Sequence, residues 1–321
     1  DIGAPAVDAG DGPAVTKDAA APAIDAGPAE EDAGSTPPNP ACKALGPHGK
    51  LEFKAGQTNA KFTYDNQGKT SQRTLVVVAP SPLQPNKAYP LFFVFHGSGG
   101  GTKGFVAQCK AALKKGRQAI CVVPQGGPQT KSGKPGWNLG GGQTGEDDLA
   151  FVRSLWAAVK SNKNVDTSRV VAYGNSMGAG FVGNTLAPSP CVDFLSGMGN
   201  MASTLWVKTA IEAPNKLAVV IIHGGKDPII PADGGKAFND TIFYSIEEAL
   251  AKWAQHNGCA KAGQPVTTKK PEYNRVQYTD CEQPMVLYRL HNKGHNSDVK
   301  SLLKMSNFEL MFDVMVDHKV P

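Results

Sequence analysis

The 321-residue sequence contains no run of 18 or more consecutive apolar residues, so it predicts no membrane-spanning helix. It also lacks a C-x-x-C pair, and its six cysteines are spaced too widely for a zinc ribbon. The phosphate-binding motif G-x-x-x-x-G-K-S/T does not occur in the chain. We therefore expect no metal ion and no cofactor.

Residues 1–40 lack aromatic side chains and consist mainly of Ala, Asp, Gly and Pro. Such a stretch cannot bury enough apolar surface to offset the entropy lost on ordering, so it predicts a disordered spacer. We expect residues 41–321 to form the folded domain. The first residue is Asp1 rather than Met, which favours a mature or trimmed chain.

The charge is unevenly distributed. Residues 1–40 hold eight acidic side chains and one lysine, a net charge of −7, whereas the whole chain carries +5, which leaves about +12 on residues 41–321. The lysines of this part are dispersed, and no nucleic-acid-binding motif accompanies them. The charge therefore suggests an anionic polymer partner, such as an acidic cell-wall polysaccharide, and no nucleic acid.

We expect a monomer.

Strand and helix patterns alternate after Cys42, which predicts an α/β fold with a mostly parallel sheet and helices on both faces. The interval between the strands at 194–199 and 217–223 is short, so no large lid is expected. The other predicted strands are 51–55, 61–65, 72–79, 91–96, 119–124, 169–174 and 285–290, and the predicted helices are 103–115, 147–162, 177–187, 242–257 and 299–317.

The strongest chemical signal is Gly174-Asn175-Ser176-Met177-Gly178, which follows an apolar strand and precedes a helical pattern. This is the context of a G-x-S-x-G nucleophile elbow, in which a sharp turn presents the serine at the end of the sheet. A tight turn with an exposed serine is the alternative interpretation. We predict that Ser176 is a nucleophile.

A serine hydroxyl needs a base to remove its proton. In folds with a nucleophile elbow, the serine is followed along the chain first by the acid and then by the base. His295 lies in the polar loop NKGHNSD after the strand at 285–290, where a base belongs. His291 ends that strand and remains the alternative. His256 lies in a helix and is interpreted as a solvated residue.

The acid is predicted from the segment IIHGGKDPIIP. Asp227 lies four residues past the end of a buried strand, in a turn that Gly224, Gly225 and Pro228 favour. His223 is interpreted as a residue that orders this loop. The competing acids farther along the chain are Asp233, Asp240 and Glu247.

An acyl-transfer site also needs backbone N–H donors for the oxyanion. Met177 should provide one, directly after the nucleophile. The glycine-rich loop after the strand at 91–96 should provide the other, with Ser98 as the first choice and Gly97 and Gly99 as alternatives. His96 is interpreted as a residue that holds this loop.

The same loop contains G-x-G-x-x-G at 99–104, a possible dinucleotide fingerprint. That fingerprint requires an acidic residue about 20 positions farther on. No Asp or Glu occurs between Gly101 and Gly145, so the dinucleotide interpretation fails.

With these motifs identified, the chain resembles the secreted esterases grouped as polyhydroxybutyrate depolymerases, feruloyl esterases and acetylxylan esterases. The resemblance implies an α/β-hydrolase fold with Ser176, Asp227 and His295 as the triad. The matching segments run in family order over residues 72–310, and they are YPLFFVFHGSGGG, CVVPQG followed by GWN, DDLAFVRSL, NVDTSRVVAYGNSMGAG, IIHGGKDPIIP, SIEEALAKWAQHNGC and Gly-His at 294–295.

The sequence departs from the family pattern at two places beside the expected site. Asn296-Ser297-Asp298 follows the Gly-His pair where family members often have an aromatic residue and Pro, and Met177-Gly178 stands where many relatives have Asn-Gly. Because both departures lie beside the expected site, they bear on which ester is the substrate, and they leave the predicted acyl-transfer chemistry unchanged.

We therefore predict a serine esterase, secreted or tethered to the cell surface, that cleaves polymeric or aromatic esters such as feruloyl or acetyl esters of plant cell-wall polysaccharide. A polyhydroxyalkanoate depolymerase is the alternative enzyme, and an inactive hydrolase-fold binding module is the alternative outside enzymes. Trp137, in KPGWNLGGG, is a candidate stacking surface for an aromatic acyl group or a sugar, with a core tryptophan as the alternative.

The even number of cysteines favours three disulfides and an oxidising compartment over six buried thiols in a cytosolic enzyme. Cys259 and Cys281 end a helical and a strand-like segment that can fold back on each other. Cys109 and Cys121 flank one helix-to-strand connection. Elimination then leaves Cys42 with Cys191.

Overall fold

The computed structural model describes residues 42–237, 240–259, 264–295 and 297–321. The chain divides into two units, Asp1–Pro38 and Asn39–Pro321, and the first unit lies outside the described residues. The spacer at residues 1–40 therefore stays a prediction. In the second unit, the described strands form one ten-stranded sheet and two small two-stranded sheets.

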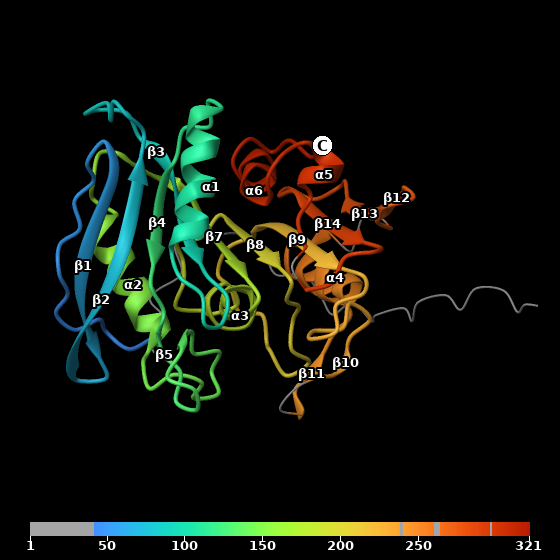
Figure 1. Ribbon diagram of the computed structural model, residues 1–321, viewed down its shortest axis with the longest axis horizontal. Coiled ribbons are helices and arrows are strands. Elements are labelled where there is room, and N and C mark those ends of the chain that lie inside the picture. Colours follow the sequence, from blue (N-terminus) through green and yellow to red (C-terminus); the bar gives the residue numbers. More distant parts are fainter. Residues whose placement is uncertain (1–41, 238–239, 260–263, 296) are drawn as a thin grey trace, which may run out of the picture. The chain divides into compact units, whose positions relative to one another are not determined.

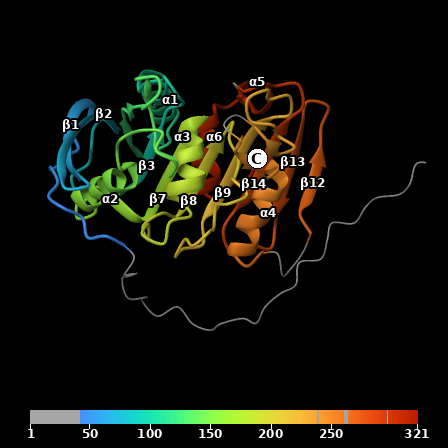
Figure 2. The same cartoon turned by 90° about the horizontal axis from the view of Figure 1, so that it is seen from below.

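The large sheet has a parallel centre and antiparallel edges, and Figure 2 shows the order running from blue β1 to orange β12. β3, β4, β7, β8, β9 and β14 are joined in parallel, while β1 and β2 at one edge and β13 and β12 at the other pair antiparallel. The strands are β1 (Gly56–Asn66), β2 (Lys69–Ala79), β3 (Tyr89–Phe95), β4 (Ile120–Pro124), β7 (Val165–Asn175), β8 (Gly197–Met201), β9 (Ala218–Gly224), β12 (Val266–Lys269), β13 (Tyr273–Tyr278) and β14 (Met285–Leu290). The predicted α/β class with a mostly parallel sheet is confirmed.

Helices cover both faces of this sheet, which is why every residue of β3 and β9 is buried. α1 (Lys103–Lys114) and α6 (Asn307–Met315) pack into the core of one face and lie side by side (Figure 1). α2 (Asp148–Val159), α3 (Met177–Phe181) with its π-helical continuation Val182–Leu186, and α4 (Ile246–His256) pack into the core of the other face. A short helix, α5 (Lys300–Leu303), precedes α6.

The two small sheets lie in connecting segments. β5 (Gly127–Pro128) pairs with β6 (Pro135–Gly136) between β4 and α2. β10 (Gly235–Lys236) pairs with β11 (Ile242–Phe243) between β9 and α4.

Besides β8, which spans Gly197–Met201 where the prediction was 194–199, three predicted elements differ from the structure. Residues 51–54 have no regular structure, and the first described strand begins at Gly56, whose φ of +80° favours glycine. The predicted helix at 242–257 begins only after Ser245, which forms a capping box with Glu248. The predicted helix at 299–317 is divided in two, because Lys304 is left-handed and Ser306 caps a new helix.

The described cysteines form three disulfides, Cys42–Cys191, Cys109–Cys121 and Cys259–Cys281, which are the pairs that the sequence predicts. In the part of the chain that the structure describes, no helix is long and apolar enough to span a bilayer. The same residues contain no cluster of three or more His, Cys, Asp or Glu side chains suited to a metal ion.

Candidate active site

Ser176 lies in the turn between β7 and α3, with φ of 52° and ψ of −119°. A residue other than glycine rarely adopts this backbone conformation, so the surrounding structure must enforce it. The two flanking glycines allow the close packing. A Cβ atom on Gly174 would lie 2.3 Å from the carbonyl carbon of Gly178, and one on Gly178 would lie 2.3 Å from the oxygen of Phe95. The turn therefore requires both glycines.

Three side chains from three loops meet at this turn. The hydroxyl of Ser176 is 2.7 Å from Nε2 of His295, and Nδ1 of His295 is 2.8 Å from Oδ2 of Asp227. Because a carboxylate only accepts, Nδ1 carries the proton and Nε2 is left to accept from the serine. The three residues follow β7, β9 and β14, whose carboxyl ends share one edge of the sheet. The fold thus brings together residues that lie 119 and 68 positions apart.

The carboxylate of Asp227 is buried and surrounded by donors. Its Oδ1 accepts from the backbone N–H groups of Ile229 and Ile230 at 2.8 and 3.1 Å, and its Oδ2 lies 3.2 Å from Nε2 of His223. Burial alone would raise the pKa of Asp227, but the hydrogen bonds from His223, His295 and the two backbone groups hold that pKa well below its usual value. Asp227 is therefore ionised at neutral pH.

The loops that carry Asp227 and His295 are fastened to each other. The N–H of Gly225 donates to the oxygen of Leu290 at 2.7 Å, and the N–H of Lys226 donates to the oxygen of Lys293 at 3.0 Å. A Cβ atom on Gly224 would lie 2.2 Å from the oxygen of Gly294, so this approach requires glycine. These contacts fix the distance between the carboxylate and the imidazole.

The alternative acids and bases lie elsewhere. Nδ1 of His291 contacts the oxygen of Pro271, and Nε2 of His256 contacts the oxygen of Asn215. The N–H at Nε2 of His223 is shared between Oδ2 of Asp227 at 3.2 Å and the oxygen of Ile230 at 2.9 Å, and so orders the loop of Asp227. The competing carboxylates pair with cations, Asp233 and Glu247 with Arg289 and Asp240 with Lys236.

The glycine-rich loop after β3 lies against the serine, since a Cβ atom on Gly97 would be 3.2 Å from Cβ of Ser176. The N–H of Gly99 already donates to the oxygen of Pro135 at 2.7 Å, so Gly99 is not a free donor. Ser98 is exposed, and its hydroxyl accepts from Nε2 of Gln129 at 2.8 Å. Met177 begins α3 directly behind Ser176, where helix N–H groups lack partners in the helix.

The side chain of His96 fixes the same loop through two hydrogen bonds. Its Nδ1 donates to the oxygen of Gly97 at 2.8 Å, and its Nε2 accepts from the N–H of Gly126 at 2.9 Å. Burial lowers the pKa of His96, which favours the neutral ring that this pattern requires.

Trp137 is not a stacking surface for substrate, and the prediction that it binds substrate is wrong. Its side chain is fully buried, and its ring packs on Phe95 and Phe181 with centroids 5.1 and 5.7 Å away. Its Nε1 donates to the backbone oxygen of His96 at 2.8 Å. Trp137 therefore supports the loop that contains Ser98.

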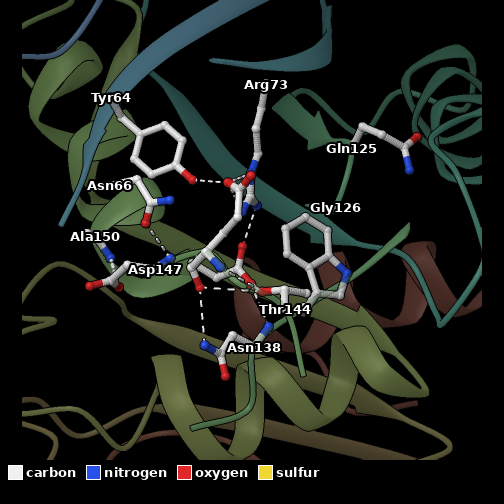
Figure 3. A network of polar contacts seen from close by, with 12 residues as sticks. Tyr64, Asn66, Arg73, Gln125, Gly126, Asn138, Thr144, Asp147 and Ala150 are labelled. Carbon is white, nitrogen blue, oxygen red and sulfur yellow. Dashed lines mark hydrogen bonds and ion pairs between the residues drawn. The ribbon is translucent and has the colours of Figure 1, made fainter. Parts of the chain in front are cut away.

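A polar network that includes Tyr64 and Arg73 is drawn in Figure 3, and the guanidinium carbon of Arg73 lies 5.8 Å from the ring centroid of Trp137. Arg73, only 5% exposed, donates to Glu146 at 2.8 Å and also to Asp148, while the hydroxyl of Tyr64 donates to Glu146. Burial raises the pKa of Tyr64, which keeps that hydroxyl protonated. Asp148 in turn accepts from the backbone N–H of Asn138. The network anchors the segment between β4 and α2 that carries Trp137.

The sequence alone did not predict this network, and the helix predicted at 147–162 simply begins with Asp147 and Asp148. Asp147 does cap α2, accepting from the N–H of Ala150 at 2.9 Å, whereas Asp148 points inward to Arg73. One signal was available. Arg73, Leu75 and Val77 are alternate residues of β2 and so face the same, buried side of the sheet. A cation on that side needs a buried partner of opposite charge.

No family model matches the chain. It is 26% identical over 235 residues to a probable feruloyl esterase C of Aspergillus niger, covering 70% of this chain and 76% of that protein. It is also 26% identical over 221 residues to feruloyl esterase B of Piromyces equi, covering 65% of this chain and 40% of that protein.

Two solved structures resemble the fold. Thermogutta terrifontis esterase 2 has a TM-score of 0.51 at 15% identity and covers 85% of this chain and 100% of that one. An acetyl xylan esterase from Aspergillus awamori has a TM-score of 0.50 at 13% identity, covering 70% of this chain and 89% of that one. The chain has the α/β-hydrolase fold. Because its sequence relatives are named feruloyl esterases, the chain is a carboxylic-ester hydrolase. The predicted resemblance to the feruloyl esterase group is confirmed.

Proposed function

We propose that this protein is a serine esterase that cleaves feruloyl or acetyl esters of plant cell-wall polysaccharide through an acyl-enzyme. The observation that carries the proposal is the hydrogen-bonded series from Ser176 through His295 to Asp227. A serine next to a neutral imidazole that is oriented by an ionised carboxylate is the arrangement that activates a hydroxyl for attack on a carbonyl.

In the proposed cycle, Oγ of Ser176 attacks the ester carbonyl while Nε2 of His295 takes the hydroxyl proton. Asp227 keeps the other proton on Nδ1 and stabilises the imidazolium. The N–H groups of Met177 and Ser98 hold the oxyanion, and one such donor contributes about 3 kcal/mol. The alcohol leaves with the proton from His295, and a water molecule activated by His295 then releases the acid.

The choice of feruloyl or acetyl esters as substrates is based on the names of the similar proteins. Both curated relatives are named feruloyl esterases, and one of the two structures is an acetyl xylan esterase. Because Trp137 is buried, recognition of an aromatic acyl group would have to use other side chains. The three disulfides support secretion or tethering at the cell surface, where an oxidising environment preserves them.

An activity panel tests the proposal. We expect release of ferulate from methyl ferulate or of acetate from acetylated xylan, each abolished in Ser176→Ala. Polyhydroxybutyrate should release no soluble acid. Depolymerisation of polyhydroxybutyrate without cleavage of the other two substrates would contradict the proposed ester class.

A further inference from the structure

A long groove runs between α1 and the edge strands β1 and β2. Three adjoining hollows of about 410, 350 and 580 Å³ make up this groove. The first two share Asn59, Val76 and Thr102, and the second and third share Lys110. The lining therefore continues from Gln125 at one end to Gln118 at the other. We call it the α1 groove.

The groove exists because α1 does not reach the edge of the sheet. Its apolar side, which includes Phe105, Val106 and Cys109, packs over β2 and β4. β1 lies beyond β2, so its outward residues Gln57 and Asn59 remain exposed on this face. α2 covers β1 only on the opposite face.

Four lysines line the α1 groove, namely Lys61 from β1 and Lys103, Lys110 and Lys114 from α1. All four are exposed, and none forms an ion pair with a described residue. The lining residues include no Asp or Glu. The positive charge of this groove is therefore uncompensated within the described chain.

The spacing of these cations suits a polymeric ligand rather than a small anion. Lys103 and Lys110 are seven residues apart, about two turns or roughly 10 Å along α1, and Lys114 follows one turn later on the same side. Lys61, on β1, lines the hollow at the Gln125 end of the groove, which adjoins the hollow that Lys103 and Lys110 line. A row of charges along a groove matches a ligand that repeats its negative charges.

The neighbouring hollow of about 570 Å³, beyond Gln118, is different. It is lined by Lys87, Lys115, Arg117, Arg169 and Lys319, but also by Asp313 and Asp317. Arg117 is paired with Asp313 at 2.7 Å, and Arg169 with Asp166 at 2.6 Å. Its charges are largely neutralised, so the uncompensated charge belongs to the α1 groove.

The α1 groove begins at the loop beside the candidate active site. Gln125 lines the first hollow, and its Nε2 lies 3.0 Å from Nε2 of His96 and donates to the oxygen of Gly100 at 3.2 Å. This is the loop that carries Ser98. A polymer lying in the groove would thus approach the end of the sheet where Ser176 lies.

We propose that the α1 groove binds an acidic polysaccharide whose uronate carboxylates meet the four lysines. Gln57, Asn59, Thr102 and Gln125 supply amide and hydroxyl groups for sugar hydroxyls. No aromatic side chain lines the groove among the described residues, and single-stranded nucleic acid relies on aromatic stacking. The inference rests on the proposed function, because it names the polymer that would carry the ester.

Binding to polygalacturonate tests the proposal. Affinity electrophoresis of the full chain should show retardation by polygalacturonate that 0.5 M NaCl removes through charge screening. Lys61→Gln/Lys110→Gln and Lys103→Gln/Lys114→Gln should each weaken binding by about fivefold, in line with exposed charge pairs. The matched control is Lys160→Gln/Lys163→Gln, which removes two exposed lysines near the end of α2. It should change binding by less than about twofold.

Other results would overturn the assignment. Equal weakening in the control would mean that net charge, not the groove, retains the polymer. Stronger retention by single-stranded DNA at the same salt concentration would reassign the ligand. Hydrolysis of p-nitrophenyl acetate by the unmodified chain is measured in parallel. Hydrolysis without polygalacturonate binding contradicts only the groove proposal, whereas binding without hydrolysis contradicts the proposed function and supports the groove.

Discussion

Nε1 of Trp137 donates a hydrogen bond of 2.8 Å to the backbone oxygen of His96, across 41 positions of sequence. This bond joins the segment after β4 to the loop after β3. His96 in turn holds Gly97, which lies against Ser176. The position of Ser98, one of the two proposed oxyanion donors, therefore depends on the buried side chain of Trp137.

Trp137→Phe should lower kcat for p-nitrophenyl acetate by about tenfold and leave KM nearly unchanged, because misplaced donors weaken only transition-state stabilisation. Trp156→Phe is the control, since Trp156 stacks on Phe194 at 5.0 Å, away from this loop. Both variants should lose some thermal stability. An equal loss of kcat in both would show that Trp137 acts only on the stability of the core.

Arg73→Met should lower the free energy of unfolding by about 3–5 kcal/mol, because the buried Asp148 and the half-buried Glu146 would be left without their cationic partner. Denaturant titration gives this value. Arg153→Met is the control, since Arg153 is half-buried and donates to the backbone oxygen of Lys43. A loss of less than about 1 kcal/mol in Arg73→Met would mean that the network does not hold this segment.

Gly178→Ala should abolish activity or prevent folding, because its new Cβ atom would lie 2.3 Å from the backbone oxygen of Phe95. Gly104→Ala, within α1, meets nothing within 4 Å and should be neutral or stabilising by up to about 1 kcal/mol. Thermal melts and ester hydrolysis compare the two variants. An active, stable Gly178→Ala would contradict the packing of the turn.

The low pKa of Asp227 has a consequence for acid stability. Because the folded pKa is depressed, the ionised carboxylate contributes stability above the unfolded value of about 4, and this is lost as pH falls through the folded value. The difference in Tm between the wild type and Asp227→Asn should therefore be largest above about pH 5 and shrink from about pH 4 downward. In the exposed control Asp193→Asn, the corresponding difference should stay small throughout. A difference for Asp227→Asn that does not change with pH would contradict the assignment.

The parallel centre of the sheet and the meeting of Ser176, Asp227 and His295 were predictable from the sequence. Each of these residues follows an apolar strand, and the carboxyl ends of parallel strands share one edge. β12 was not predicted, and the segment before Cys281 that forms β13 was predicted only as strand-like, because these antiparallel strands carry polar residues such as Thr267, Thr268 and Gln277.

The role of Trp137 was not predictable from its neighbours. It lies among glycines and polar residues, a pattern typical of an exposed loop. Its burial comes from Phe95 and Phe181, which are distant in sequence. Arg73 and Asp148 meet for the same reason, since their pairing depends on how β2 faces α2.

The most direct test is the rate of ester hydrolysis by folded Ser176→Ala. We predict that its kcat for p-nitrophenyl acetate falls by roughly 10⁴ or more, with a Tm close to that of the wild type. Substantial hydrolysis by this folded variant, within about tenfold of the wild-type rate, would contradict the account, because a remaining nucleophile would then have to lie outside the turn between β7 and α3.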